Sequence, residues 1–446
     1  MEQQMQWKRL LSDKRFGMES YHDASKHKRT DFQRDYDRLI FSAPFRRLQN
    51  KTQVFPLPGS VFVHNRLTHS LEVACVGRSL GDRIGEELFL KYKSEETVFH
   101  QLGSVVSAAC LAHDLGNPPF GHSGESAITG YFADGNGQAL ITKLQEEGAC
   151  YSDFLHFEGN ANAFRLLTHR FKGRREGGFV MTYATLASII KYPYSSLLCG
   201  KKGKFGFFES ESAGYLKIAD ELGIIKVSDS PLKAVRYPLV YLVEAADDIC
   251  YQIMDIEDAH KLRIISTPEC MQLFLDFFEE KKKDRMIRIM GLVDDVNEKI
   301  AYLRSCVIGL LIDECCNVFL AGEDKILNGL FEGALIKHIE ERAKKAYDQC
   351  SRLAIDRIYR SRDVLDIELA GYRIIHFLMD YLLDAVTNPE KSYSKLIIDR
   401  IPEQYETDAP DTYTRIQAVL DYISGMTDIY ALELYRKMTG MNLPTL

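Results

Sequence analysis

The chain has 446 residues, of which 46% are hydrophobic and 27% are charged, and its formal net charge is −7. This length is ample for a hydrophobic core, and the acidic balance argues against a surface that binds nucleic acid globally. The longest strongly apolar run, residues 307–312, is too short to span a bilayer, and the first ten residues lack the apolar segment of a signal peptide. The ten cysteines include no C-x-x-C pair. We therefore expect a cytoplasmic protein with reduced thiols, without a membrane segment, zinc ribbon or disulfide framework.

The first predicted elements are two short strands. Residues 52–55 and 61–63 have strand character, and the prolines and glycine between them indicate a turn, so a small β-hairpin is expected near the N-terminus. After it, helical periodicity dominates, and the fold class is predicted to be all-α. The helical stretches with the clearest apolar spacing are residues 67–88, 239–250, 303–312 and 374–385.

The first of these helices carries His69 and Arg66 near its start. His69 could face the helix that ends at His113, which makes it a candidate second imidazole ligand of a metal. Arg66 lies one turn earlier on the same face, where a fixed cation would suit a phosphate group bound beside that metal. The alternative for Arg66 is an ordinary surface salt bridge.

The motif at residues 113–125 contains two imidazoles and two carboxylates. His113 follows Ala109 and Cys110 by four and three residues, so it extends the buried stripe of the preceding helix. A helix that ends in His113-Asp114 offers one metal a neutral nitrogen and a hard oxygen, a mixture that suits Mn, Fe, Co, Zn or Mg. The residues alone leave the identity of the metal open.

A second pair follows the Gly-Asn-Pro-Pro-Phe-Gly break. His122 and Glu125 are three residues apart, and they share one face if a helix starts near Ser123. The carboxylate could then orient an imidazole that acts as general acid or base. A single His on an apolar face is more often a hydrogen-bonded core residue, but four such groups around one loop favour chemistry.

Acidic residues recur along the predicted helix at residues 237–258. Asp247, Tyr251, Asp255 and Asp258 follow one another at intervals of four, four and three, which places them on one face. Stacked acids require a cation or a hydroxyl-rich partner. Asp247 is expected on the buried side of the helix, where an uncompensated carboxylate would be costly and a metal would compensate it.

Together, His69, His113-Asp114 and Asp247 resemble the H…HD…D pattern of the HD-domain metal phosphohydrolases. Four longer motifs closely resemble the bacterial dGTPase (dNTP triphosphohydrolase) branch of that superfamily; they are residues 46–55, 113–125, 157–161 and 425–428. The resemblance spans almost the whole chain. It implies a single domain, residues 1–446, in which an HD core (about 60–260) carries a helical C-terminal extension (about 261–446).

The resemblance also implies an activity and partners. The reaction of that branch converts a dNTP and water to a deoxynucleoside and inorganic triphosphate, with a divalent metal as cofactor. Mn or Mg is the first expectation, with Co, Fe, Zn or Ni as alternatives. Homo-oligomers, often hexamers, are implied as well. The base preference, the native metal, the oligomer size and any activating dNTP or single-stranded DNA stay open.

Residue roles follow by position from the same resemblance. The metal ligands would be His69, His113, Asp114 and Asp247, and the catalytic pair would be His122 and Glu125, with the direction of proton transfer undecided. The deoxyribose contacts would be Gln53, Val54, Tyr251 and Asp255, and the phosphate contacts would be Arg66 and Lys191.

Two other functions compete with this interpretation. A different HD phosphohydrolase, acting on nucleoside monophosphates, cyclic nucleotides or alarmones, would keep the metal ligands without needing the long motif around His122. A non-enzymatic regulator would bind dNTP or single-stranded nucleic acid without turnover. The products separate the three cases: triphosphate, monophosphate or none.

Overall fold

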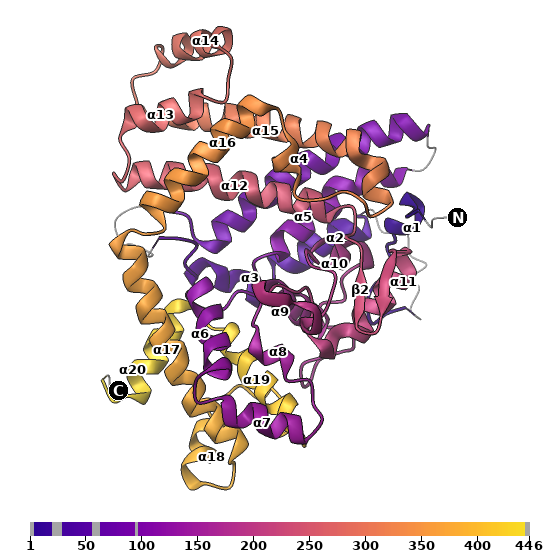
Figure 1. Ribbon diagram of the computed structural model, residues 1–446, viewed down its shortest axis with the longest axis vertical. Coiled ribbons are helices and arrows are strands. Elements are labelled where there is room, and N and C mark those ends of the chain that lie inside the picture. Colours follow the sequence, from indigo (N-terminus) through magenta and orange to yellow (C-terminus); the bar gives the residue numbers. More distant parts are fainter. Residues whose placement is uncertain (1–3, 20–28, 56–62, 94–96, 442–446) are drawn as a thin grey trace.

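The computed structural model of the protein describes residues 4–19, 29–55, 63–93 and 97–441 (Figure 1). Its α-helices are α1 (Trp7–Leu10), α2 (Asp31–Ile40), α3 (Ala43–Arg47), α4 (Arg66–Tyr92), α5 (Leu102–Ala112), α6 (His122–Ala133), α7 (Gln138–Glu146), α8 (Ser152–Leu155), α9 (Gly159–Thr168), α10 (Tyr183–Ser188), α11 (Ser212–Leu222), α12 (Val240–Lys261), α13 (Thr267–Leu275), α14 (Glu280–Met290), α15 (Val296–Leu327), α16 (Glu341–Leu353), α17 (Arg362–Thr387), α18 (Ser392–Ile398), α19 (Thr412–Ser424) and α20 (Asp428–Met438).

The predicted all-α class is confirmed, because helices account for nearly all of the regular structure that is described. The described sheet is a two-stranded antiparallel one, formed by β1 (Lys226–Asp229) and β2 (Leu232–Ala234). The hairpin expected near the N-terminus falls partly on residues 56–62, which lie outside the described residues. Beside that gap, Thr52 and Asn65 form an isolated antiparallel bridge.

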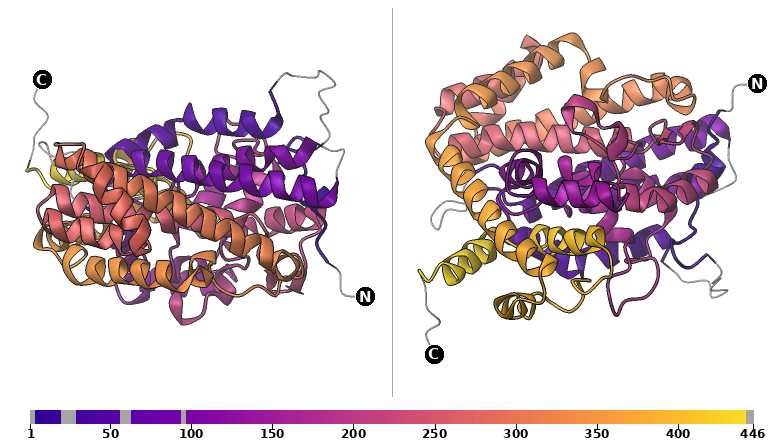
Figure 2. Two further views of the ribbon diagram at one scale, coloured as in Figure 1. Left: turned by 90° about the horizontal axis from the view of Figure 1, so that it is seen from above. Right: turned by 60° about the horizontal axis from the view of Figure 1, so that its bottom comes forward.

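The hydrophobic core has two parts. The larger is built mainly from α2, α4, α5 and α10–α16, and the smaller from α6–α8, α17, α19 and α20. The smaller part fills the lower half of Figure 1. Helix α20 lies on the opposite side of the molecule from α1 (Figure 1), and Figure 2 shows two further views.

Helices α4 and α5 approach each other closely because glycines line their contact. Gly77, Gly81 and Gly85 recur every fourth residue of α4 and so share one face. A methyl group on Gly81 would lie 2.7 Å from the Cα of Gly103, and one on Gly85 would lie 2.2 Å from the carbonyl oxygen of Phe99. Larger side chains would separate the two helices, and His69 and His113 depend on their spacing.

By length and composition alone, helix α15 could cross a membrane. It packs along α12, α13 and α4, so its buried apolar face, which includes Leu303, Val307 and Leu311, belongs to the core. This packing places one apolar face of α15 in the core of the protein.

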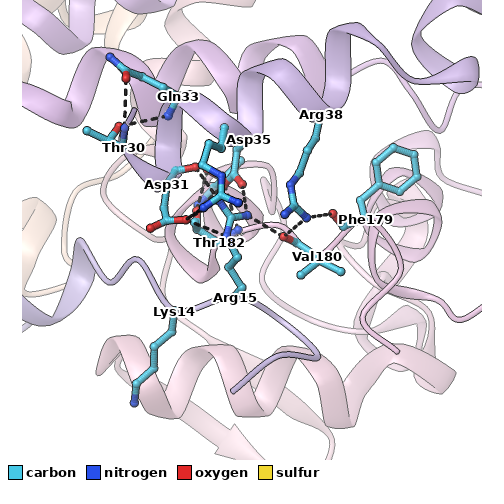
Figure 3. Close-up of polar contacts among 12 residues, drawn as sticks. Lys14, Arg15, Thr30, Asp31, Gln33, Asp35, Arg38, Phe179, Val180 and Thr182 are labelled. Atoms are coloured by element: carbon cyan, nitrogen blue, oxygen red, sulfur yellow. Dashed lines mark hydrogen bonds and ion pairs between the residues drawn. The ribbon is translucent and has the colours of Figure 1, made fainter. Parts of the chain in front are cut away.

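A buried charge network fixes the start of α10 (Figure 3). Asp35, on α2, accepts hydrogen bonds from Arg15 Nη1 (2.7 Å), the backbone N–H of Thr182 (2.9 Å) and the Thr182 hydroxyl (2.6 Å). Thr182 in turn caps α10 by accepting from the N–H of Thr185. The segment that follows α10 contains Lys191, so the network helps to place that lysine.

Replacing Gly81 with Ala is expected to lower the free energy of unfolding by about 1–3 kcal/mol, because the added methyl group overpacks the α4–α5 contact. Gly309→Ala is the matched control, because a methyl group on Gly309 of α15 meets nothing within 4 Å. Its better helix propensity should raise the free energy of unfolding by about 1 kcal/mol. Urea denaturation followed by circular dichroism measures both, and equal stabilisation of the two variants would contradict the close approach.

Candidate active site

A cavity of about 370 Å³ lies where α4, the end of α5, the start of α6 and α12 come together. The cavity lies between the two parts of the core, since α4, α5 and α12 belong to the larger part and α6 to the smaller. The residues that line it are Gln53, Arg66, His113, Asp114, Asn117, His122, Glu125, Glu158, Asn160, Ser188, Ile189, Lys191, Tyr192, Lys204, Val240, Val243, Glu244, Asp247, Asp248, Tyr251 and Tyr347.

Three of the predicted metal ligands meet at the wall of this cavity, which His113 and Asp114 line. His69 comes from α4, His113 ends α5 and Asp114 follows it, and their ligand atoms all lie within 4.8 Å of one another. The fourth, Asp247 of α12, places Oδ1 3.0 Å from His69 Nε2 and 3.5 Å from His113 Nε2. Such spacings match neighbouring ligands around a small divalent ion, which lie about 3 Å apart when each bond is about 2.1 Å.

The tautomer of His113 suits a ligand. Its Nδ1 lies 2.6 Å from the carbonyl oxygen of Cys110, which can only accept a hydrogen bond, so Nδ1 carries the proton. The other nitrogen, Nε2, is then directed at Asp114 and Asp247. The helix that positions His113 thus also fixes which nitrogen faces the cavity.

A buried oxygen without a partner supports a cation here. Asp114 Oδ1 pairs with Arg66 Nη1 at 3.0 Å, but Asp114 Oδ2 is buried and accepts no hydrogen bond from the described residues. An unpartnered buried carboxylate oxygen is costly unless a ligand compensates it. Gln53 Oε1 and Arg66 Nε are likewise buried without partners. The donor set of two imidazoles and two carboxylates therefore fits a divalent metal ion.

The electrostatics of the cluster favour charged carboxylates. Burial acts to raise the pKa of Asp114, but the charges of Arg66, His113 and His69 outweigh it and hold that pKa below its ordinary value. Burial likewise opposes ionisation of Asp247, yet His113 and His69 lower its pKa well below the usual range. Both carboxylates are thus ionised at neutral pH, and despite the opposing effect of burial they in turn raise the pKa of His113 to about 9, so a metal that binds this imidazole would displace a proton.

Arg66 is not a surface residue. It is buried at the first turn of α4, and its ion pair with Asp114 excludes the ordinary surface salt bridge as its explanation. Asp247 is half-buried rather than buried as expected, because its carboxylate opens into the cavity.

His122 and Glu125 form a hydrogen-bonded pair at the start of α6. His122 Nδ1 lies 2.9 Å from Glu125 Oε2, the geometry that their three-residue spacing predicts. Glu125 is itself held by the N–H of Gly159, which donates to Oε1 at 2.8 Å. The hydrogen bond that His122 donates to Glu125 raises the pKa of His122 above its ordinary value. Because 80% of the His122 side chain is exposed, its free Nε2 is accessible to a ligand in the cavity.

Two lysines face the cavity in ion pairs with acids. Lys191 Nζ lies 3.1 Å from Glu244 Oε1, and Lys204 Nζ lies 2.6 Å from Glu158 Oε2. Sequence reasoning singled out Lys191 but missed the role of Lys204. The signal was present, because Glu158 stands in the motif at residues 157–161 and Lys204 in a lysine-rich glycine loop.

The remaining predicted contacts divide into two groups. Gln53 and Tyr251 line the cavity, whereas Val54 packs against the larger core and Asp255 is buried outside the lining. Asp255 Oδ2 accepts a hydrogen bond from the hydroxyl of Tyr359 at 2.6 Å, and burial raises the pKa of Asp255 to about 8. Sequence reasoning also missed other lining residues, among them Asn160, Tyr192, Asp248 and Tyr347.

Comparison with known proteins finds two family matches. Residues 66–229 match the HD domain, and residues 338–437 match the phosphohydrolase-associated domain. The chain is 38% identical to a deoxyguanosinetriphosphate triphosphohydrolase-like protein of Pseudomonas aeruginosa, over 99% of this chain and 100% of the relative. A protein of the same description from Synechocystis sp. is 36% identical over 98% and 100%. The deoxyguanosinetriphosphate triphosphohydrolase of Yersinia enterocolitica is 30% identical over 91% and 93%.

His113→Ala and Asp247→Ala are each expected to bind a divalent metal at least ~10-fold more weakly, because each removes one of a small set of ligands. His338→Ala is the matched control, since His338 is exposed and contacts the carbonyl of Glu332 outside the cavity. Mass spectrometry of the metal content after dialysis against Mn measures the effect. Full occupancy in the His113 and Asp247 variants would show that the ligands are misassigned.

Proposed function

The chain belongs to the deoxyguanosinetriphosphate triphosphohydrolase-like family of HD-domain proteins, and from this membership and its site we propose that it is a metal-dependent dNTP triphosphohydrolase. It would convert a dNTP and water to a deoxynucleoside and inorganic triphosphate. The observation that carries the proposal is the combination, in one cavity, of a ligand cluster for a divalent cation, an imidazole–carboxylate pair and basic side chains suited to phosphates.

His69, His113, Asp114 and Asp247 would hold the ion, with Mn or Mg as the first candidates. A divalent ion at this position supplies Lewis acidity and a nucleophilic water at neutral pH. Arg66 pairs with the proposed ligand Asp114, so its guanidinium would contact the α-phosphate. Lys191 and Lys204 stand further along the cavity wall and would neutralise the rest of the triphosphate as charge develops on it.

His122 would act as the general acid. Its raised pKa favours the protonated imidazole, and Glu125 holds the proton on Nδ1 while Nε2 faces the cavity. The proton on Nε2 would pass to the 5′-oxygen of the deoxynucleoside as the bond from that oxygen to the α-phosphorus breaks. Triphosphate then leaves intact. We therefore propose the acid role for His122, one of the two directions of proton transfer that the sequence left open.

The sugar would bind beside Gln53 and Tyr251. Gln53 Oε1 is buried without a partner and can accept a hydrogen bond from a sugar hydroxyl, and the Tyr251 ring forms the adjacent wall. We place Val54 and Asp255 behind this wall, where they would limit the room for a 2′-hydroxyl. All ten cysteines are free thiols, which supports the proposal of a cytoplasmic enzyme.

Product analysis tests the function. Purified protein would be incubated with each dNTP, with a ribonucleotide control, and with Mn or Mg, and the products would be separated by anion-exchange chromatography. Equal amounts of deoxynucleoside and triphosphate are expected. Monophosphate and pyrophosphate would indicate a different HD phosphohydrolase, and binding without turnover would indicate a regulator.

His122→Ala is expected to retain its metal and bind dNTP but to turn over about 10²–10⁴-fold more slowly, the usual range for loss of a general acid or base. Metal content, dNTP binding and kcat would be measured on the same preparation. Near-normal turnover of the folded protein would remove His122 from the mechanism.

Glu125→Gln should move the alkaline limb of the pH–rate profile to lower pH. An acid with a raised pKa is active below that pKa and loses its proton as the pH rises through it. Gln can still accept from Gly159 but no longer stabilises the imidazolium, so the pKa of His122 falls towards its ordinary value. The profile of kcat/KM against pH measures the shift, and an unmoved limb would contradict the pairing.

A further inference from the structure

Asp428 connects the C-terminal helices to two segments of the candidate active site. It is the first residue of α20 and only 7% exposed. Its Oδ1 accepts a hydrogen bond from the N–H of Phe120 at 2.9 Å, and its Oδ2 accepts one from the N–H of Thr52 at 2.8 Å. Phe120 lies two residues before His122, and Thr52 directly precedes Gln53. One carboxylate therefore fixes the backbone next to both residues.

Lys51 makes a second connection at the same place. Its buried Nζ donates to the carbonyl oxygens of Asn117 at 2.5 Å and Ser424 at 2.7 Å. The loop between α5 and α6 is thus attached at Asn117 to Lys51, which also contacts the last residue of α19, and at Phe120 to the first residue of α20. These contacts join three motifs that are far apart in the sequence, at residues 46–55, 113–125 and 425–428.

The loop needs such support because its conformation is strained. Phe120 has a φ of +62° and Gly121 a φ of +56°, both in the left-handed region. A residue with a Cβ rarely adopts this region, and such a conformation persists only when surrounding contacts enforce it. The hydrogen bond to Asp428 acts on the N–H of the strained residue itself. The direction in which α6 starts, and hence the position of His122, depends on this turn.

Asp428 is not needed to cap its own helix. Thr427 is the N-cap of α20 and accepts a hydrogen bond from the N–H of Tyr430 at 3.1 Å. In contrast, Asp411 at the start of α19 bonds within its own helix, to the N–H of Thr414. Both oxygens of Asp428 instead accept from N–H groups outside α20. The capping role and the attachment to the loop are therefore separate.

We propose that Asp428 is a positioning residue for catalysis, which holds the strained turn before His122 and the segment that carries Gln53 in register. The expected effect on kcat rests on the proposed function, whereas the expected effect on the loop between α5 and α6 does not. Asp428→Asn leaves one acceptor oxygen and turns an amide NH₂ towards a backbone N–H, so one of the two bonds is lost. The metal ligands are untouched by this change.

The test compares Asp428→Asn with Thr427→Ala in the full-length protein. Asp428→Asn is expected to keep its metal. Its kcat should fall about 10–10²-fold and its KM should change by a smaller factor, because a catalytic group is misplaced while the substrate still binds. Hydrogen–deuterium exchange of the peptide at residues 115–122 should become faster. Thr427→Ala removes the helix cap and should leave kcat and the exchange of that peptide near wild type.

Each outcome is decisive. Wild-type kcat and unchanged exchange in folded Asp428→Asn would overturn the proposal, and so would an equal kinetic defect in Thr427→Ala, which would reduce the role of Asp428 to stability. If Asp428→Asn does not fold, Asp428→Glu keeps a carboxylate one methylene longer and should show the same loss of kcat at full metal content. If the wild-type protein hydrolyses no dNTP, the proposed function fails, while the exchange experiment still tests the positioning of the loop.

Discussion

The close approach of α4 and α5 is the constraint on which the site depends. His69 and His113 come from these two helices, and their imidazoles can share one cation because glycines, not larger side chains, separate the backbones. Helix α12 packs against the same contact, and the Cβ of Ala246 lies 3.6 Å from where a methyl group on Gly77 would be. Asp247 is the next residue after Ala246, so the close packing of α12 also positions the Asp247 carboxylate.

Charge is distributed around the cavity in opposed pairs. Arg66 faces Asp114, His122 faces Glu125, Lys191 faces Glu244 and Lys204 faces Glu158. Pairing lowers the cost of burying each group and fixes long side chains in place before a ligand arrives. Under the proposed function, a triphosphate would compete with these carboxylates for the basic side chains. The affinity for the triphosphate would therefore depend on how much more strongly the basic side chains pair with phosphate oxygens than with these carboxylates.

The sequence predicted the features that depend on local spacing. Periodicity located the long helices, and the three-residue interval anticipated the contact between His122 and Glu125. The resemblance to HD phosphohydrolases indicated that His69 and His113-Asp114 would meet, although they lie on different helices. Their roles in binding and catalysis stay predictions until the variants are measured.

Contacts between distant segments could not be predicted in this way. No periodicity relates Lys204 to Glu158 or Asp428 to Phe120, because each pair is created by how whole helices pack. The sheet of β1 and β2 is also absent from the prediction, since its strands are only four and three residues long and β1 is mostly exposed. Short elements carry too little pattern to be distinguished from loops.

The loop between α5 and α6 also has an electrical polarity that does not come from its side chains. It leaves the C-terminal end of α5 at His113 and enters the N-terminal end of α6 at His122. The aligned peptide dipoles of the two helices place roughly half a negative charge at the first end and half a positive charge at the second, each worth about 0.3–1 kcal/mol to a suitable ion. A cation is thus favoured at one end of the loop and a phosphate at the other. Even with neutral side chains at both ends, the backbone would still distinguish the two.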